Sequence, residues 1–376
     1  MTRHVILVGG GHSHVQVLEA LASDPLAGAK VKVVVDKPIA IYSGMVPGYV
    51  AGQYRADELE IDVPALCRHA GVDVIVETVE KIDAHRQLIH VAGHEPLSYD
   101  FASLNIGSTV AGLDTPGIRA HAIPTRPISD LVSRVDSLVS QAAARPGQDP
   151  FRVIVVGGGA GGIELAFTFR ERLIHCGAGP VATTLVHAGA EILEGYPDSL
   201  ARKVHRLAEP RDIDIVCTRR VTAAEPHRVL LDNGIRLPFD ALIWVTGAVS
   251  HALLSASGLP VEDRGFVEIR STLQVEGFDN LFAVGDCATL IDYPKTPKAG
   301  VYAVRQGPYL TANLRAVLEG RPLEIYRPQS DFLTLLNLGD GTALGAKWGR
   351  SFHGKWVMRL KDWIDQRFMQ RFRLDT

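Results

Sequence analysis

One pattern occurs twice in this sequence and limits the possible folds more than any other feature. It consists of a short run of β-forming residues, a glycine-rich turn and a segment whose apolar residues have helical spacing. The first copy spans residues 4–22, and its turn carries Gly9 and Gly11, the first two glycines of G-x-G-x-x-G. The second copy spans residues 152–169 and carries all three: Gly157, Gly159 and Gly162. Such turns let a pyrophosphate approach the N-terminus of the following helix. Because a duplicated pattern has few false matches, we predict an α/β chain with two Rossmann-like dinucleotide-binding domains.

The two units carry different residues at the end of their second strand. In the first unit the strand ends in Asp36, a carboxylate placed to accept hydrogen bonds from ribose hydroxyls. In the second unit that residue is His187, so a preference for NADH over NADPH is not encoded, and histidine would tolerate a 2′-phosphate better than an acid. His14 occupies the third glycine position of the first loop, where its bulk should separate helix from strand slightly. The adjoining His12 and Ser13 are further candidate cofactor contacts.

Two later segments indicate where the chain passes between domains. Residues 99–108 and 239–247 each contain a strand that ends near a glycine, Gly107 and Gly247 respectively, which are further candidate cofactor contacts. We therefore expect the second domain to be inserted in the first, followed by a small C-terminal α+β region. The predicted divisions are an FAD domain of residues 1–118 and 265–330, an NAD(P) domain of residues 119–264 and a C-terminal region of residues 331–376.

A buried strand near residue 280 ends in Gly285-Asp286, and a helix is predicted shortly after it. Asp286 could anchor the ribityl chain of FAD, with Gly285 letting the backbone come close, although an ordinary turn would also place an aspartate there. The helix is predicted over residues 297–318, with Thr296 as its N-cap and a proline at its first position. Its positive end would face the flavin and favour the anionic reduced ring, and Lys298 could add charge. The alternative is an ordinary capped helix with an exposed lysine.

Composition and cysteine spacing exclude several classes of function. The net charge of −3 gives no global reason to expect nucleic-acid binding. The four cysteines are Cys67, Cys176, Cys217 and Cys287. They form no C-x-x-C or C-x4-C pair, so neither a metal site nor a local redox dithiol is encoded. The apolar run Val5–Val8 is too short for a signal peptide, and no apolar stretch approaches the ~18–20 residues that span a bilayer. We expect a cytoplasmic protein, with peripheral attachment to the inner face of the membrane and homodimer formation left open.

The C-terminal region changes in character. Residues 332–348 predict a hairpin closed by a D-G turn. Residues 355–372 predict a helix with apolar residues on one face: Trp356, Leu360, Trp363, Ile364 and Phe368. Six basic residues make it cationic: Lys355, Arg359, Lys361, Arg367, Arg371 and Arg373. A basic amphipathic helix with two tryptophans suits the membrane interface. The alternative is a helix that packs on its own protein or on a second subunit.

Taken together, these motifs resemble the two-dinucleotide-binding flavoproteins of the pyridine nucleotide-disulfide oxidoreductase superfamily, over nearly the whole chain. The missing cysteine pair and the segment G-G-G-A-G-G-I-E-L-A at residues 157–166 are similar to type II NADH dehydrogenases. Residues 9–18 and 43–54 are similar to an oxidoreductase-like module found alone or fused to selenophosphate synthetase. The resemblance implies FAD held by Gly9, Gly11, Asp36 and Asp286. It implies NADH or NADPH held by Gly157, Gly159 and Gly162.

The resemblance also implies catalytic candidates. Glu164 matches a glutamate that type II NADH dehydrogenases place near flavin and quinone, although a first-turn glutamate is also favoured by the helix dipole. Residues 41–48 read I-Y-S-G-M-V-P-G, and Gly44 lies where disulfide-reductase relatives place a cysteine beside the flavin. Gly44 and Pro47 would make an inert, closely approachable wall of the pocket, the alternative being a tight connecting loop. Type II NADH dehydrogenases lay their C-terminal segment on the membrane, which favours membrane contact for residues 355–373.

These observations predict an FAD-dependent oxidoreductase that takes hydride from NAD(P)H onto flavin N5. Electrons would pass directly to a quinone or another small acceptor, with no protein disulfide. One alternative is oxidation of a reduced sulfur or selenium compound at the flavin, although the four cysteines do not sit where sulfide-oxidising relatives carry them. Another alternative is a non-catalytic sensing or binding module in which FAD is structural.

Overall fold

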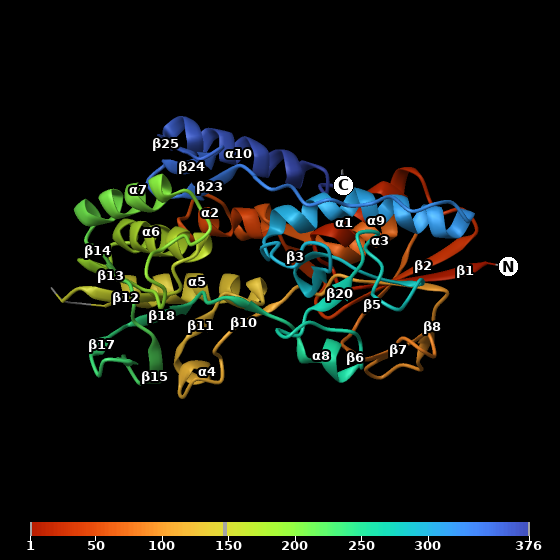
Figure 1. Cartoon of the computed structure of the whole chain (residues 1–376). Coiled ribbons are helices and arrows are strands. Elements are labelled where there is room, and N and C mark those ends of the chain that lie inside the picture. The colour runs from red at the N-terminus through yellow and green to blue at the C-terminus, as the bar shows by residue number, and fades with distance from the viewer. Residues whose placement is uncertain (1, 146–148, 375–376) are drawn as a thin grey trace.

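The computed structural model describes residues 2–145 and 149–374, which form two lobes side by side (Figure 1). The lobe at the right of Figure 1 is built on a five-stranded parallel sheet in the order β21-β9-β1-β2-β5. Its strands are β1 (Arg3–Val8), β2 (Ala29–Val35), β5 (Asp73–Val76), β9 (Phe101–Leu104) and β21 (Leu281–Ala283). Residues 5–8 are all buried, as expected of a parallel strand covered on both faces. The helices of this lobe are α1 (His12–Ser23), α3 (Val63–His69) and α9 (Gly300–Glu319).

The second lobe repeats this plan. Its parallel sheet has the order β11-β18-β12-β13-β14. The strands are β11 (Ile123–Pro124), β12 (Phe151–Val156), β13 (Val181–Val186), β14 (Ile213–Val216) and β18 (Ala241–Trp244). The helices are α5 (Ile128–Ala143), α6 (Ala160–His175) and α7 (Asp198–Ala208). In both lobes a buried strand leads through a glycine turn into a helix, which confirms the prediction of two Rossmann-like sheets.

Smaller elements complete the lobes. Each lobe carries a three-stranded antiparallel sheet. These sheets consist of β6 (Val79–Asp83), β7 (Leu88–Val91) and β8 (Leu97–Ser98), and of β15 (Val221–Glu225), β16 (Arg228–Leu231) and β17 (Arg236–Pro238). Two further strand pairs are β3 (Ile39–Ile41) with β4 (Glu60–Asp62), and β20 (Val267–Ile269) with β22 (Ala288–Leu290). The short helices are α2 (Val46–Val50), α4 (Ile118–His121), α8 (Ala252–Ala256), η1 (Ser43–Met45), η2 (Ala56–Glu58), η3 (Glu209–Arg211) and η4 (Gly285–Cys287).

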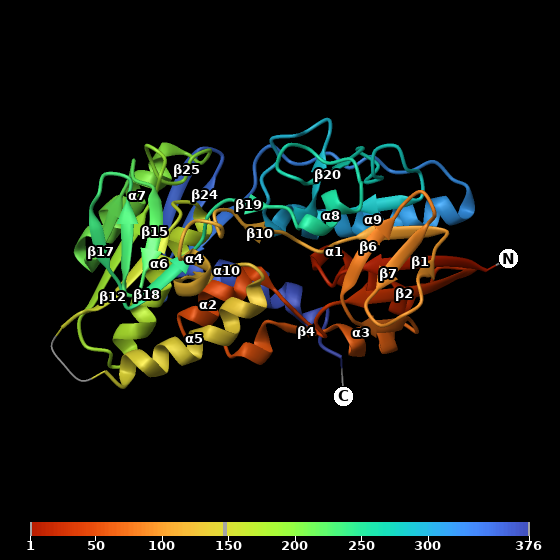
Figure 2. The ribbon, with the colours of Figure 1, turned by 90° about the horizontal axis from the view of Figure 1, so that it is seen from below.

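The chain crosses between the lobes twice. The outgoing strand β10 (Thr109–Val110) pairs antiparallel with the returning strand β19 (Ala248–Val249), and the pair lies between the lobes in Figure 2. The crossings follow the two segments that the sequence indicated. Strand β21 belongs to the first sheet but follows every strand of the second sheet in the sequence, so the second unit is inserted in the first. The exact divisions after residues 118, 264 and 330 stay predictions.

The C-terminal region forms a sheet and one long helix. The predicted hairpin is confirmed as β23 (Thr334–Asn337) and β24 (Ala343–Lys347), and the helix as α10 (Lys355–Gln370). A third strand, β25 (Arg350–Gly354), was not predicted, since its sequence lacks apolar alternation. A tight turn at Trp348-Gly349, both with positive φ, joins β25 to β24. In Figure 1, α10 runs along the top of the molecule from the second lobe toward the first.

The structure corrects the predicted start of α9. The helix begins at Gly300, after an extended Ala299, and not near residue 297. Thr296 is not its cap, because the Thr296 hydroxyl donates to the Tyr293 carbonyl and closes a separate turn. The predicted end is confirmed within a residue or two, where Gly320 takes a left-handed conformation. Among the described residues, no helix is both long and apolar enough to cross a bilayer.

Candidate functional site

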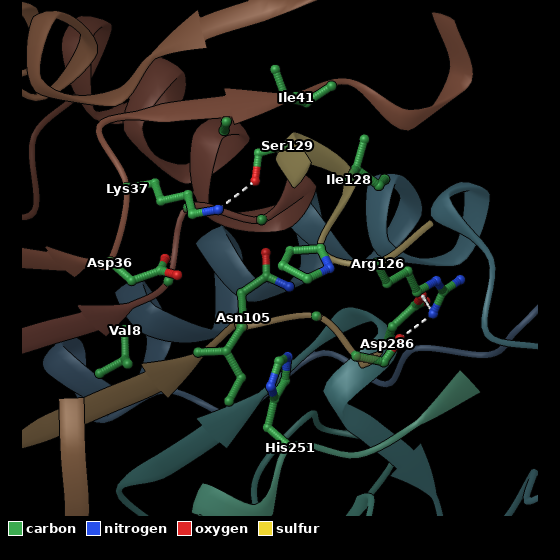
Figure 3. Close-up of a pocket in the computed structure, with 18 of the residues that line it drawn as sticks. Val8, Asp36, Lys37, Ile41, Asn105, Arg126, Ile128, Ser129, His251 and Asp286 are labelled. Carbon is green, nitrogen blue, oxygen red and sulfur yellow. Dashed lines mark hydrogen bonds and ion pairs between the residues drawn. The ribbon is translucent and has the colours of Figure 1, made fainter. Parts of the chain in front are cut away.

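A cavity of about 440 Å³ lies at the carboxyl ends of the first sheet, where open α/β sheets bind their ligands (Figure 3). It contains six of the predicted cofactor contacts: Gly9, Gly11, His12, Asp36, Gly107 and Asp286. The second lobe also contributes to its wall, through the segment Arg126–Ser129 that precedes and begins α5. The N-terminal residues of two helices, His12 of α1 and Gly300 of α9, face the same space.

Asn105, at the end of β9, holds the first glycine loop in place. Its side-chain oxygen accepts hydrogen bonds from the backbone N–H groups of Ser13 (3.1 Å) and His14 (3.2 Å). A Cβ atom on Gly9 would lie 2.5 Å from the Asn105 carbonyl oxygen, and one on Gly11 would lie 2.4 Å from its side-chain oxygen. Only glycine fits either position. The structure corrects the prediction for Ser13, because its hydroxyl donates to the Ala303 carbonyl (2.7 Å) and does not line the cavity.

His14 joins the helix to the strands. Its Nδ1 lies 2.7 Å from the Gly9 carbonyl oxygen and its Nε2 lies 2.9 Å from the Ser103 hydroxyl of β9. Burial lowers the pKa of His14 to about 4, so the ring is neutral at physiological pH. The bulky residue at the third glycine position therefore acts as a polar link within the core, and the sequence alone had suggested only a steric wedge.

Charged and polar groups lie along the length of the cavity. Asp36 stands at the end of β2, and His251, just before α8, also lines the cavity (Figure 3). Burial lowers the pKa of His251, and the charge of Asp36 opposes that shift. Asp286 pairs with Arg126 of the second lobe at 2.9 Å, and the same guanidinium donates to Ser108. Gly285 lies behind this wall, where its N–H donates to Gln306 (2.6 Å).

These residues fit FAD. Glycine positions that no Cβ could occupy leave room for a pyrophosphate at the N-terminus of α1. Asp36 stands where a ribose hydroxyl pair would bind, and the cavity volume of about 440 Å³ lies in the range of cofactor sites. Sequence reasoning missed three residues that complete the site: Asn105, Arg126 and His251. Arg126 and His251 belong to no motif. Asn105 carried a local signal, because it lies two residues before Gly107 in the predicted segment 99–108.

The structure places Lys298 away from the cavity, contrary to prediction. Its ammonium donates to the Thr289 hydroxyl (2.8 Å) and the Ala288 carbonyl, and it lies 4.0 Å from the centre of the Phe266 ring. Burial lowers its pKa to about 8. The reason is the later start of α9, which leaves Lys298 in the connection before the helix and turned toward β22.

Residues 43–50 form two short helices where the sequence suggested a turn. Ser43 lines the cavity, and its hydroxyl lies 3.3 Å from Nε2 of His12. Gly44 stands directly behind, with its carbonyl oxygen accepting a hydrogen bond from Lys361 of α10 (2.7 Å). Pro47 is buried at the start of α2 and does not line the cavity, so its role is to begin a helix.

A polar cluster lies behind this segment, and we call Glu164, Lys361, Asp365 and Tyr42 the α10 cluster. Lys361 and Asp365 form a buried ion pair at 2.9 Å, and the Tyr42 hydroxyl donates to Asp365 at 3.1 Å. Glu164 accepts a hydrogen bond from the Asn337 N–H at 2.9 Å. Burial raises the pKa of Glu164 to about 7, although the positive charge of Lys361 lowers it. The cluster brings together all three regions of the chain.

The second glycine loop has the same steric character as the first. Gly157 has a φ of +129°, and a Cβ atom there would lie 2.1 Å from the Val245 carbonyl oxygen. A Cβ atom on Gly162 would lie 1.8 Å from the Gly157 carbonyl oxygen, whereas nothing lies within 4 Å of one on Gly159. The open side at Gly159 is where a ligand could approach the start of α6. Gly247 belongs to the crossing, where its carbonyl accepts from Ala111 at 2.8 Å.

Two Rossmann-like sheets, the second inserted in the first and each with a glycine loop at a helix N-terminus, define a class of proteins with two dinucleotide-binding units. The chain belongs to the pyridine nucleotide-disulphide oxidoreductase family, whose profile matches residues 3–307. Among the described residues no cysteine lines the cavity, and all four cysteines are free thiols. Burial raises the pKa of the Cys287 thiol to about 11.

Individual relatives are distant. The chain is 26% identical to a type II NADH:quinone oxidoreductase of Staphylococcus epidermidis over 97% of its own length and 94% of that protein. It is 28% identical to the demethylphylloquinone reductase NdbB of Synechocystis, over 65% of this chain and 60% of that protein. Among solved structures, the sulfide:quinone oxidoreductase of Aquifex aeolicus has a TM-score of 0.83 at 18% identity, covering 99% of this chain and 92% of that one. NDH2 from Plasmodium falciparum, in complex with NADH, has a TM-score of 0.80 at 12% identity, covering 98% of each chain. These structures share the fold.

Proposed function

We propose that this protein is an FAD-dependent NAD(P)H:quinone oxidoreductase that passes electrons to the quinone without a redox disulfide. The observation that carries the proposal is the position of Glu164. Glu164 comes from the pyridine nucleotide unit, and burial raises its pKa to about 7. It belongs to the α10 cluster, whose Lys361 bonds the Gly44 carbonyl directly behind Ser43 of the cavity wall. Relatives named type II NADH:quinone oxidoreductase, aligned over 94% of their length, support the same acceptor.

Each part of the proposed site has a physical task. When bound, FAD supplies two-electron acceptance from a pyridine nucleotide and donation to a quinone. The N-termini of α1 and α9, at His12 and Gly300, face the cavity, and their backbone N–H groups favour a negatively charged group there. Tyr42, a member of the α10 cluster, packs against Phe368 with ring centres 4.5 Å apart, and this contact would limit the access of water to the cluster. Glu164 holds a proton near neutral pH and can give it to a quinone oxygen that becomes more basic as it is reduced.

Direct transfer also agrees with the position of the cysteines. Cys67 and Cys287 are buried, and no cysteine of the described residues lines the cavity. The fold is shared with a sulfide:quinone oxidoreductase, which keeps oxidation of a reduced sulfur or selenium compound as the second candidate. The high pKa of the Cys287 thiol argues against a thiolate that would carry sulfur beside Asp286.

The test is anaerobic mixing of the FAD-loaded protein with NADH or NADPH, followed by addition of a soluble quinone. We expect rapid bleaching of the flavin absorbance with at least one nucleotide and rapid recovery with the quinone. A flavin that neither nucleotide bleaches would contradict the proposal. Bleaching by sulfide with no response to nucleotides would favour the second candidate, and a bound flavin that no donor reduces would favour a sensing module.

We further propose that α10 attaches the protein to a membrane surface. One face of α10 packs on the protein, and this corrects two predictions. Lys361, counted among the basic residues of the helix, is buried, and Phe368 is buried although it was predicted to share one apolar face with the exposed Trp356 and Trp363. The opposite face exposes Trp356 (55%) and Trp363 (57%), with the Arg367 guanidinium 5.3 Å from the Trp363 ring centre. Trp348, in the neighbouring turn, is 80% exposed. Tryptophan with arginine is the composition that binds at lipid headgroups.

The double substitution Trp356→Ser with Trp363→Ser should lower co-sedimentation with anionic vesicles by about tenfold or more. The loss of each indole ring removes apolar area that would be buried in the lipid interface. Vesicle sedimentation at constant lipid concentration measures the bound fraction. Ile235→Ser is the matched control, because Ile235 is 51% exposed in the turn before β17, at the opposite end of the second lobe in Figure 1. Equal binding by the native protein and the double variant would show that α10 does not hold lipid.

A further inference from the structure

An acidic residue from further along the chain lies beside the end of β13, and the sequence pattern did not reveal it. His187 stands where an acidic residue would accept hydrogen bonds from the adenosine ribose, and it is turned toward the glycine loop. Its Nδ1 accepts a hydrogen bond from the Gly158 N–H at 3.1 Å. In a neutral imidazole the proton is then on Nε2. That nitrogen lies 3.9 Å from the carboxylate of Glu194, seven residues further along the chain.

The backbone brings Glu194 to this position. The Leu193 N–H donates to the Gly158 carbonyl at 2.8 Å, so the segment after β13 folds back onto the glycine loop. Leu193 has a positive φ of 57°, a conformation that a leucine adopts only when its surroundings require it. Gly189 leaves space for the acid, because a Cβ atom there would lie 2.2 Å from the Glu194 carboxylate. The Glu194 carboxylate thus lies over the strand end, beside the loop that would hold the pyrophosphate.

We infer that Glu194 makes this protein select NADH over NADPH, by accepting hydrogen bonds from the 2′-hydroxyl of the adenosine ribose and repelling a 2′-phosphate. The inference rests on the proposed function, since it assigns the donor of that same site. It reverses the expectation that His187 alone would tolerate a 2′-phosphate. His187 instead holds the glycine loop through the Gly158 N–H, and the carboxylate missing from the end of the strand is supplied by Glu194.

Two other charged side chains near the end of β13 contact groups other than Glu194. Glu191 pairs with His205 of α7 at 2.9 Å. The Arg219 N–H donates to the His187 carbonyl, but the Arg219 guanidinium donates to the Thr218 carbonyl at 2.7 Å. Glu194, with a side chain 66% exposed, accepts no hydrogen bond within the described part of the chain and is free to meet a ligand.

The test compares binding of ADP-ribose and 2′-phospho-ADP-ribose to the FAD-loaded protein by calorimetry, a readout that needs no flavin reduction. We expect the native protein to bind ADP-ribose about tenfold or more tightly, and Glu194→Gln to bring the two affinities within about threefold. Glu194→Arg should reverse the preference. High salt should reduce the discrimination of the native protein, since the repulsion acts at an exposed site. Stopped-flow reduction of the flavin by NADH and NADPH should follow the same order.

Glu191→Gln is the matched control, because it removes a carboxylate of the same loop, and this carboxylate pairs with His205. It should leave the preference for ADP-ribose over 2′-phospho-ADP-ribose unchanged. Equal or tighter binding of the 2′-phosphorylated ligand by the native protein would overturn the inference while the proposed function stands. A native preference that survives Glu194→Gln would also overturn it, by assigning selectivity to another group. If neither ligand binds and neither nucleotide bleaches the flavin, the proposed function fails as well.

Discussion

Replacement of Glu164 by glutamine should lower quinone reduction by about a hundredfold while leaving flavin reduction by NADH within about twofold, as expected for loss of a general acid. Glutamine keeps the size of the side chain and can still accept the hydrogen bond from the Asn337 N–H, but it cannot release a proton. Stopped-flow spectroscopy separates the two half-reactions. The effect should therefore appear only after the quinone is added.

The pH profile gives an independent readout of the same group. Burial raises the pKa of Glu164 to about 7, above its usual value of 4.5, so the proton is present below pH 7 and is lost as the pH rises through 7. Quinone reduction by the native protein should fall across that interval, and the Glu164→Gln variant should lack this step. Glu164→Asp should retain a titration at a shifted pH. Glu209→Gln, at an exposed site of the second lobe, serves as the control.

A different result would reassign Glu164. Equal losses in both half-reactions would place Glu164 in binding of the pyridine nucleotide, close to the start of α6. Unchanged rates in both would leave it as a structural acid that accepts the hydrogen bond of Asn337.

Replacement of Lys361 by methionine should lower the free energy of unfolding by about 3–5 kcal/mol, the usual effect of breaking a buried ion pair. Lys361 is 7% exposed, and its ammonium bonds both Asp365 and the Gly44 carbonyl. Burial alone would lower its pKa, but attraction to Asp365 and Glu164 raises it, so the lysine is charged in the folded protein. Methionine would leave the Asp365 carboxylate buried beside Tyr42 without a cation. Urea denaturation followed by tryptophan fluorescence measures the loss.

A second variant distinguishes charge from packing. In Lys361→Met with Asp365→Leu both charges are gone, and much of the stability should return, since apolar pairs of similar volume often replace buried ion pairs at little cost. Lys355→Met, at an exposed position of the same helix, should change stability by less than about 0.5 kcal/mol. A loss below about 1 kcal/mol for Lys361→Met would show that solvent reaches the pair and screens it.

Six of the residues that the sequence predicted as cofactor contacts line the cavity of the first lobe. Gly9, Gly11, Asp36 and Asp286 could be placed because each belongs to a strand-and-turn pattern of a few contiguous residues. Lys298 was misplaced because the start of α9 depends on the turn at Thr296, which the capping rules cannot distinguish from a helix N-cap. Arg126 and His251 were missed because no local pattern marks them, whereas Asn105 lies in the predicted segment 99–108 and was not singled out there.

By itself the sequence determined the two Rossmann-like units, their glycine loops and the absence of a redox dithiol, because these properties are encoded by residues close together in the chain. Only the tertiary structure decided which distant side chains meet. Lys361 reaches Gly44 across 317 positions, and Arg126 of the second unit reaches Asp286 of the first. At the end of β13, Glu194 lies beside His187 because the backbone turns back at Leu193. The burial of these side chains and the charges around them depend on how the units pack together. A local pattern of residues carries no information about that packing.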